Sequence, residues 1–316
     1  MAVVWVTGAR GFIGRNLSKY LAQQGDEVLG VGHGAWLPET PISFGVSYWI
    51  NGEIDDSNLR QMLDTSGQPD VIYHLAGGSS VGLSMQTPAE DYHRSVSTTS
   101  KLLEWIRGNV PETRLVVSSS AAIYGNTQMD VITEDGYFTP YSPYGFHKRA
   151  AELLCESYAH NFGLRIAIVR LFSVYGSGLC KQLLWDLCCR LQQSPSKLNL
   201  HGTGSEIRDW LYIEDAVKVL VAASANASCT PFTVNGGTGI GTCVRDVATL
   251  LCRAWGQSIE IKFSGEQRAG DPFSLIADTK RLRSLGFVPQ HKLTSGLEEY
   301  VNWFRQLNTG INQKHE

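Results

Sequence analysis

The chain has 316 residues, of which 43% are hydrophobic and 18% are charged, and its formal net charge is -3. This balance gives no electrostatic reason to expect a nucleic acid or a membrane surface as partner, and no apolar run reaches the roughly 18 residues that span a bilayer. There is no signal-peptide pattern, and the seven cysteines form an odd set without metal-ligand spacing. We therefore expect a cytoplasmic protein with mostly buried free thiols and no metal.

The first fourteen residues predict a nucleotide-binding turn. Residues 3–6 are uniformly apolar and predict a short buried strand, while the periodicity of residues 13–21 predicts a helix. Gly8, Gly11 and Gly14 lie between the two elements. Glycine allows positive φ in a turn and lets the backbone approach a pyrophosphate, which the helix N-terminus can then bind. We interpret this stretch as a dinucleotide-binding turn.

The second predicted strand bears on the choice of cofactor. It covers Glu27–Val31, and Gly32 and His33 follow it where this architecture usually places an acidic residue on the adenosine ribose. Arg10 lies inside the glycine turn. A ribose 2′-phosphate attracts a guanidinium and repels a carboxylate, so the arrangement favours NADP. The alternative is that Arg10 and His33 are exposed loop residues and that NAD is held through backbone contacts.

Further strands alternate with helices in this half of the chain. Strands are predicted at Val46–Ile50, Asp70–Ala76, Arg114–Ser119 and Leu164–Phe172, with a long helix at Pro88–Asn109. This alternation predicts a parallel, doubly wound sheet, whose ligands lie beyond the carboxyl ends of the strands. Two features at these strand ends suit a dinucleotide. The carboxylate of Glu53 could bind the adenine amino group, and the small residues that begin at Gly77 would let the chain pass close to the cofactor. His74 alone is more typical of a packed core histidine than of a catalyst.

A candidate catalytic group follows. Ser142 and Pro143 predict a helix start, and Tyr144 and Lys148 lie one turn apart on that helix. Tyrosine has an unperturbed pKa near 10, and a neighbouring ammonium together with a cationic nicotinamide lowers the pKa of such a phenol. Ser120, at a strand end, can donate a hydrogen bond to the same substrate oxygen. Tyr144 would then exchange a proton with a sugar hydroxyl or ketone.

The C-terminal part has shorter elements. Lys181–Gln193 is amphipathic and predicts a packing helix. Short strands are predicted at Val234–Gly237 and Leu275–Asp278, and helices at Val244–Trp255 and Gly296–Leu307. We expect the polar segment after Asn308 to be frayed.

The motifs TGARGFIG, HLAGGSS, SSSAAIYG, YSPYGFHK, RLFSVYG, HGTGSEIRDWLYIED and RAGDP, taken together in this order, resemble the extended short-chain dehydrogenase/reductase family, in its branch that modifies nucleotide sugars. The resemblance implies an α/β fold with a Rossmann-type doubly wound parallel sheet in residues 1–172 and a smaller C-terminal α/β substrate domain in residues 173–316, some segments of which return to the first. It also suggests a homodimer that pairs the helices at residues 88–109 and 143–162.

The expected site combines the residue-based reasoning with this resemblance. Catalysis is assigned to Ser120, Tyr144 and Lys148. The cofactor site comprises Gly8, Arg10, Gly11, Phe12, Ile13, Gly14, Gly32, His33, Glu53, Ile54, Leu75, Ala76, Gly77, Tyr144 and Lys148. The nucleotide-sugar site comprises Ser79, Ser120, Ser173, Arg208, Arg268 and Asp271, with the two arginines on the diphosphate.

The segment SSSAAIYG narrows the expected reaction. Dehydratases and decarboxylases of this family carry acidic residues where this chain has Ala121 and Ala122, and methyl groups cannot act as acid or base. The later Tyr175-Gly176-Ser177-Gly178 also lacks the histidine of the 3,5-epimerases. Our leading hypothesis is an NADPH-dependent reductase of a nucleotide-linked 4-keto-6-deoxyhexose in cell-surface polysaccharide synthesis. The alternative is a 4-epimerase with tightly bound NAD; a non-enzymatic sugar-nucleotide sensor is disfavoured because the catalytic trio is complete.

Overall fold

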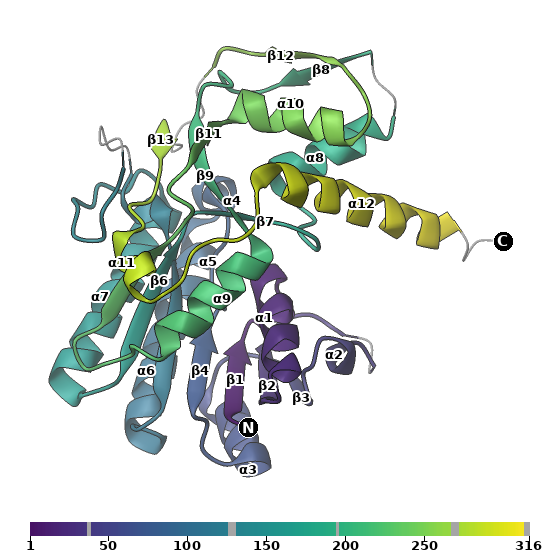
Figure 1. The fold of residues 1–316 in the computed structure, drawn as a ribbon. Helices are drawn as coiled ribbons and strands as arrows, with labels where there is room; N and C mark the ends of the chain where they lie inside the picture. The colour runs from purple at the N-terminus through teal and green to yellow at the C-terminus, as the bar shows by residue number, and fades with distance from the viewer. Residues whose placement is uncertain (37–38, 126–130, 194–195, 267–271, 313–316) are drawn as a thin grey trace.

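A seven-stranded parallel sheet forms the centre of the molecule (Figure 1). The computed structural model describes residues 1–36, 39–125, 131–193, 196–266 and 272–312. The strand order is β10-β6-β5-β4-β1-β2-β3, and every neighbouring pair is parallel. The strands are β1 (Val3–Thr7), β2 (Glu27–Gly32), β3 (Tyr48–Asn51), β4 (Val71–His74), β5 (Arg114–Ser120), β6 (Ile166–Leu171) and β10 (Phe232–Gly236).

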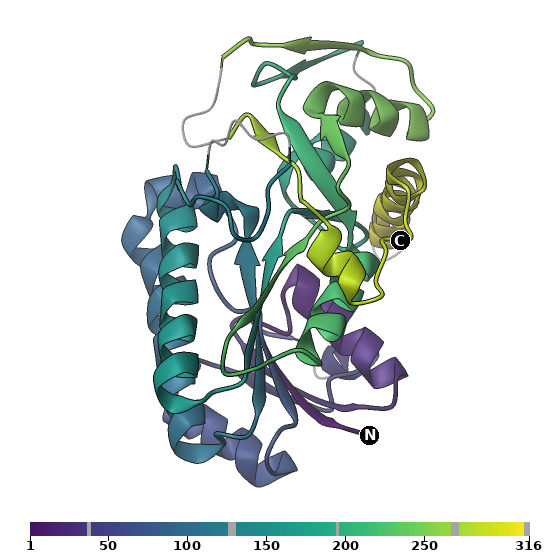
Figure 2. The ribbon, with the colours of Figure 1, turned by 60° about the vertical axis from the view of Figure 1, so that its left-hand side comes forward.

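Helices cover both faces of the sheet, because side chains of a buried strand point alternately to either side. Val4 and Val6 pack into one core, whereas Trp5 between them packs into the other. Figure 2 shows the sheet nearly edge-on between the two helical layers. One layer contains α1 (Phe12–Gln23) and α9 (Ile213–Ser224); the other contains α3 (Asp56–Ser66), α6 (Thr98–Asn109) and α7 (Pro143–Phe162).

Local sequence explains the ends of α7. The Ser142 hydroxyl accepts a hydrogen bond from the backbone N–H of Gly145, Pro143 is the first helical residue, and Gly163 ends the helix with φ of +72°. The expected long helix at residues 88–109 is interrupted. It consists of α5 (Pro88–Tyr92), a π-helical turn η1 (His93–Ser97) and α6. The apolar pattern could not distinguish a π turn from a continuous α-helix.

A second group of elements lies above the carboxyl edge of the large sheet (Figures 1 and 2). β9 (Ile207–Tyr212) is central to it and pairs with β7 (Ser173–Tyr175), β11 (Gly241–Cys243) and β13 (Ser274–Leu275); β8 (Lys197–Leu200) pairs with β12 (Glu260–Phe263). Its helices are α8 (Gln182–Leu191), α10 (Val244–Ala254) and α12 (Leu293–Asn312). The remaining helices are α2 (Thr40–Ser43), α4 (Val81–Gln86), η2 (Ala121–Ile123, a 3-10 turn) and α11 (Lys280–Ser284).

Two expectations about the chain need correction. α12 extends through Asn312, so the helix does not end at Leu307 as its polar sequence indicated. All seven cysteines are free, but only Cys155, Cys188 and Cys252 are buried, whereas Cys180 and Cys229 are exposed. In the described part of the chain, no helix has both the length and the apolar character needed to cross a membrane.

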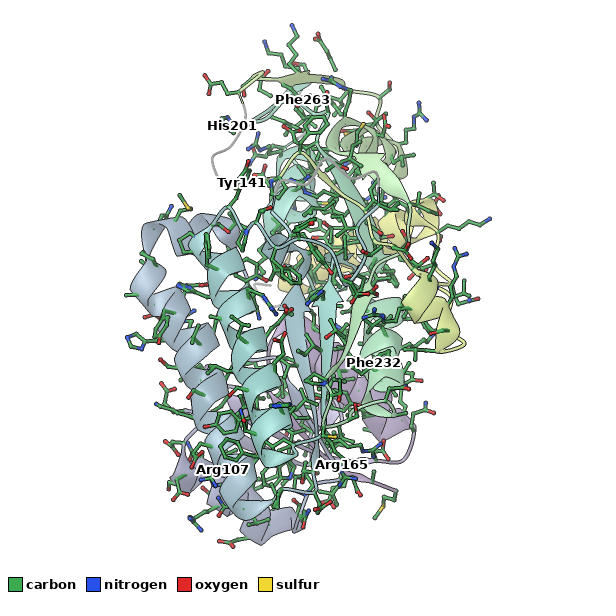
Figure 3. The ribbon with its side chains drawn as sticks, turned by 90° about the vertical axis from the view of Figure 1, so that its left-hand side faces the viewer. Arg107, Tyr141, Arg165, His201, Phe232 and Phe263 are labelled. Atoms are coloured by element: carbon green, nitrogen blue, oxygen red, sulfur yellow. The ribbon has the colours of Figure 1, made fainter. Side chains whose placement is uncertain are left out.

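The strand order places a crevice at one edge of the sheet. β1 lies between β2 and β4, so the connections run in opposite directions from β1, and ligands of such sheets bind at this switch point. In Figure 3, Tyr141 lies at the edge that faces the second group of elements, while Arg107 and Arg165 lie at the opposite edge. The carboxyl edge is therefore where the predicted site residues can meet.

Candidate active site

A cleft of about 1730 Å³ is lined by residues from the carboxyl edge of the large sheet and by residues of the second group of elements. Every predicted cofactor residue lines it. So do the catalytic candidates Ser120, Tyr144 and Lys148, and the predicted substrate residues Ser79, Ser173 and Arg208. Arg268 and Asp271, also predicted to bind the substrate, lie outside the described residues. The structure thus brings together residues from distant parts of the sequence.

The backbone of the glycine turn is packed so closely that no side chain fits at Gly8 or Gly14. Gly8 has φ of +72°, and a Cβ atom there would lie 2.9 Å from the backbone nitrogen of Ala76. A Cβ atom on Gly14 would lie 2.2 Å from the carbonyl oxygen of Gly8. Gly11 is the N-cap of α1 and provides no side-chain cap, so the first N–H groups of the helix remain available at the cleft. This cradle fits an anionic dinucleotide.

Arg10 lies against the end of β2. A Cβ atom on Gly34, which has φ of +101°, would lie 2.3 Å from the Nη1 atom of Arg10. His33 and Glu53 approach each other across the cleft wall, with 3.4 Å between Nε2 and Oε1, and both side chains are exposed. No acidic side chain follows β2 directly, as the sequence indicated.

His74 is the last residue of β4 and is buried under the residues that line the cleft. Its Nδ1 atom lies 2.8 Å from the Thr7 hydroxyl and its Nε2 atom lies 3.0 Å from the Thr99 hydroxyl. Thr7 also accepts from the backbone N–H of Ala76, so its own proton is free for Nδ1, and Nε2 can donate to Thr99. Burial and the Lys148 charge lower the pKa of His74 to about 3. His74 is therefore a neutral bracing residue in the core, as the sequence indicated.

Gly145 allows α7, which carries Tyr144, to pack closely against η2, the turn that Ser120 caps. A Cβ atom on Gly145 would lie 2.6 Å from the carbonyl oxygen of Ala122, so α7 can approach η2 only because this residue is glycine. The backbone N–H of Tyr144 donates to the Ser84 hydroxyl at 3.1 Å. Tyr144 is thereby held next to Ser120, whose hydroxyl caps η2.

The Lys148 ammonium is buried beneath Tyr144. Its Nζ atom donates to the carbonyl oxygen of Ser118 at 3.0 Å and lies 5.9 Å from the centre of the Tyr144 ring. Burial lowers the pKa of Lys148 to about 8, and the negative charges of Asp91 and Glu152 act in the opposite direction. This ammonium can therefore lose its proton within the range of pH in which enzymes work.

The phenol of Tyr144 is affected by three groups. Burial raises the pKa of Tyr144, a hydrogen bond from Ser120 lowers it, and the charge of Asp91 raises it. The opposing contribution thus comes from Ser120, whereas the sequence reasoning expected it from Lys148. The reason is distance, because the ammonium lies below the ring and bonds the Ser118 carbonyl instead of the phenolic oxygen.

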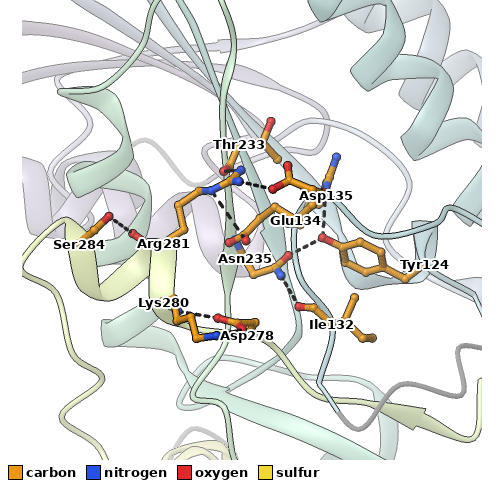
Figure 4. A network of polar contacts seen from close by, with 11 residues as sticks. Tyr124, Ile132, Glu134, Asp135, Thr233, Asn235, Asp278, Lys280, Arg281 and Ser284 are labelled. Atoms are coloured by element: carbon orange, nitrogen blue, oxygen red, sulfur yellow. Dashed lines mark hydrogen bonds and ion pairs between the residues drawn. The ribbon is translucent and has the colours of Figure 1, made fainter.

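A buried network of hydrogen bonds and ion pairs fixes the position of the chain that follows η2 (Figure 4). The Tyr124 hydroxyl donates to the Asn235 side chain at 2.6 Å, and the Asn235 amide donates to the Ile132 carbonyl at 2.8 Å. Arg170 reaches the same hydroxyl at 3.0 Å and forms a buried ion pair with Glu152 on α7 at 2.9 Å. The turn and α7 are thus tied to β6 and β10, which fixes their mutual position.

Comparison with known proteins identifies the family. A model of the NAD dependent epimerase/dehydratase family matches residues 4–235. The chain belongs to this family. The predicted resemblance to extended short-chain dehydrogenases/reductases is therefore confirmed, and so is the Rossmann-type α/β fold.

Relatives of this family match the chain over almost its whole length. A protein described as an uncharacterized UDP-glucose epimerase, YtcB of Bacillus subtilis, is 29% identical, covering 97% of this chain and 99% of the relative. The UDP-glucose 4-epimerase of Azospirillum brasilense is 27% identical, covering 98% and 94%. The solved structure of Bacillus cereus UDP-glucuronic acid 4-epimerase, in complex with UDP-glucuronic acid and NAD, has a TM-score of 0.86 at 27% identity, covering 96% and 99%.

Some residues of this epimerase/dehydratase site were missed by the sequence reasoning. Asp91, Ser84 and Lys181 contact or face predicted site residues. Asp91 and Lys181 come from segments that were predicted only as helices, and Ser84 comes from a segment for which no element was predicted. Gly145 was available in the motif YSPYGFHK, where a glycine inside a helix often marks a close approach. The other three could be found only from the tertiary structure.

Proposed function

We propose that the protein is a 4-epimerase of a nucleotide-linked hexose that holds NAD through each turnover. The arrangement of Ser120, Tyr144 and Lys148 in one cleft with the glycine cradle carries this proposal. Ala121 and Ala122, in the η2 turn after Ser120, offer no acid or base for eliminating water or carbon dioxide. The relatives described with a bound dinucleotide hold NAD, and several are UDP-sugar 4-epimerases.

Tyr144 moves the proton in this mechanism. Its phenolate takes the proton of the sugar C4 hydroxyl as that carbon becomes a ketone, and the Ser120 hydroxyl bonds the same oxygen. When bound, NAD supplies the hydride acceptor, then the hydride donor, and a positive charge in the cleft. The hydrogen bond from Ser120, which lowers the pKa of Tyr144, and the positive charge that NAD would supply favour the phenolate. Tyr144 then returns the proton after the ketone has turned its other face, so that no atom is gained or lost.

The test starts with the dinucleotide that co-purifies with the protein. It is released by denaturation and identified by chromatography, and the native protein is incubated with UDP-glucose or UDP-glucuronic acid without added cofactor. We expect bound NAD and the appearance of the corresponding C4 epimer in the proton NMR spectrum. A protein that carries no NAD and oxidises NADPH with a 4-keto nucleotide sugar would contradict the proposal.

The second candidate is the NADPH-dependent 4-keto reductase, and Arg10 favours it. The guanidinium lies against Gly34, where a 2′-phosphate could bind, and no carboxylate follows β2. The Arg10→Ala variant separates the two functions. A reductase should lose about tenfold in NADP affinity, whereas an NAD-holding epimerase should keep its cofactor content and turnover.

We also propose a homodimer that pairs residues 88–109, which form α5, η1 and α6, with α7. Large apolar side chains on α7 face solvent: Phe146 is 59% exposed, Leu153 51% and Phe162 52%. Such side chains on one helix are typical of an interface. Sedimentation equilibrium should give twice the monomer mass, and Leu153→Glu should give the monomer.

A further inference from the structure

A lysine side chain spans the cleft at a point that the mechanism does not use. Lys181 precedes α8, and its Nζ atom donates to the hydroxyl of Ser79, in the loop after β4, at 2.7 Å. Both residues line the cleft. The ammonium thus joins the second group of elements to the nucleotide-binding sheet across the space where substrate must enter.

The ammonium lies close to the catalytic candidates. Ser79 follows Gly77 by two residues, so at most about 7 Å of chain separates them. A Cβ atom on Gly77 would lie 3.3 Å from the Nζ atom of Lys148. Lys181 is therefore held near the reacting end of the cleft. Arg208, the predicted diphosphate ligand, comes from β9 in the second group of elements.

The local sequence around Lys181 conflicts with ordinary helix rules. Lys181 is the N-cap of α8, although cations are unfavourable at the positive end of a helix dipole. Gln182 has φ of +67° and is the one non-glycine residue with positive φ in the part of the chain that the structure describes. Violations of local rules that coincide at one point are expected at functional sites.

The charge of Lys181 is not balanced by a nearby carboxylate among the described residues. None of the ion pairs between them includes Lys181. Burial lowers the pKa of Lys181, and no negative group opposes that change. An ammonium whose described bond is to a neutral hydroxyl can exchange that bond for a stronger one to an anionic ligand.

We propose that Lys181 binds a carboxylate on the sugar ring, so that the substrate is a nucleotide-linked hexuronic acid. The inference rests on the proposed function and names its substrate class. The relatives act on neutral and on acidic sugars, so similarity does not choose between them. The Lys181 charge favours the acidic class, because an ammonium near the reacting end of the cleft can bind a sugar carboxylate. A neutral hexose has no such anionic group.

The test compares the binding of UDP-glucuronic acid, UDP-glucose and UDP to the NAD-containing protein by calorimetry. Lys181→Met should weaken UDP-glucuronic acid about tenfold or more and leave UDP-glucose and UDP within about twofold. Lys181→Arg should retain much of the preference. Lys19→Met, at an exposed position on α1 away from the cleft, is the matched control and should change none of the three. The melting temperature and NAD content of each variant verify its fold.

Two outcomes would overturn the inference. One is equal weakening of all three ligands, which would place Lys181 on the diphosphate; the other is unchanged binding of UDP-glucuronic acid. Because the readout is affinity, it is independent of turnover. A protein that binds the uronate through Lys181 but does not epimerise it would overturn the proposed function and leave this inference standing.

Discussion

The Nδ1 atom of His147 on α7 lies 2.7 Å from the Oδ2 atom of Asp91 on α5, and both side chains are largely buried. Gly78 makes room for the pair, because a Cβ atom there would lie 1.9 Å from the Oδ1 atom of Asp91. The carboxylate raises the pKa of both Lys148 and Tyr144. Asp91 therefore affects the protonation of Lys148 and Tyr144, although it is not among the predicted catalytic residues.

This relationship predicts a shift in the pH profile. In Asp91→Asn the negative charge is lost, so the pKa values of Lys148 and Tyr144 both fall, and both limbs of the profile of kcat/KM should move to lower pH. Activity at pH 9 should fall several-fold more than activity at pH 7. His147→Asn, which keeps the carboxylate, is the control and should leave the limbs in place. A uniform loss at every pH in Asp91→Asn would mean that the residue only supports the fold.

Tyr144→Phe tests the proton transfer. We expect kcat to fall by about 10² to 10⁴, since one general acid–base group is removed. NAD content and the melting temperature should change little, because the ring and its packing are retained. Turnover close to that of the wild type would remove Tyr144 from the mechanism.

The buried His74 predicts acid sensitivity of the fold. Its pKa is about 3 in the folded chain, against an unfolded value near 6.5, so the unfolded chain binds more protons between these limits and stability falls as pH falls. Between pH 7 and pH 4.5 the loss from this residue is about 3 kcal/mol. Urea denaturation should show a smaller loss in His74→Gln, which can still bond the two threonines. An equal pH dependence in both proteins would count against the neutral assignment.

Gly14→Ala tests the glycine turn. The added methyl would lie 2.2 Å from the Gly8 carbonyl oxygen and 2.8 Å from the Cα atom of Ala9, and backbone atoms cannot move away as a flexible side chain can. We expect a loss of about 3 kcal/mol in unfolding free energy and a drop in bound dinucleotide. Gly108→Ala in α6 is the matched control. Nothing lies within 4 Å of its methyl, so it should stabilise the helix by about 0.5–1 kcal/mol.

Much of the fold could be predicted from apolar runs and glycine positions. Strands β1, β2 and β5 agree with the predicted ranges to within a residue, because fully buried parallel strands are short and continuously apolar. The pair β8 and β12 was not predicted, since its burial alternates over only four residues. Helix α9 was not identified either, although its apolar residues have helical spacing.

The candidate site also contains residues that could be predicted from the sequence and residues that could not. Ser120, Tyr144 and Lys148 could be proposed because each belongs to a local motif. The pairs Asp91 with His147 and Lys181 with Ser79 are separated by 56 and 102 positions, and only packing brings them together. The Asp91 charge, which contributes to the pKa values of Lys148 and Tyr144, and the Lys181 charge, which is proposed to select the substrate, therefore act through tertiary contacts.

The seventh strand of the large sheet comes from residues 232–236, long after its neighbour β6 at residues 166–171. While the chain emerges from the ribosome, β6 must wait as an open edge until more than sixty further residues have been added. During that interval the loop held by Asn235 also lacks its partner. A nascent chain stopped near residue 172 should therefore be sensitive to proteases and prone to aggregation, and become resistant only after β10 has left the exit tunnel.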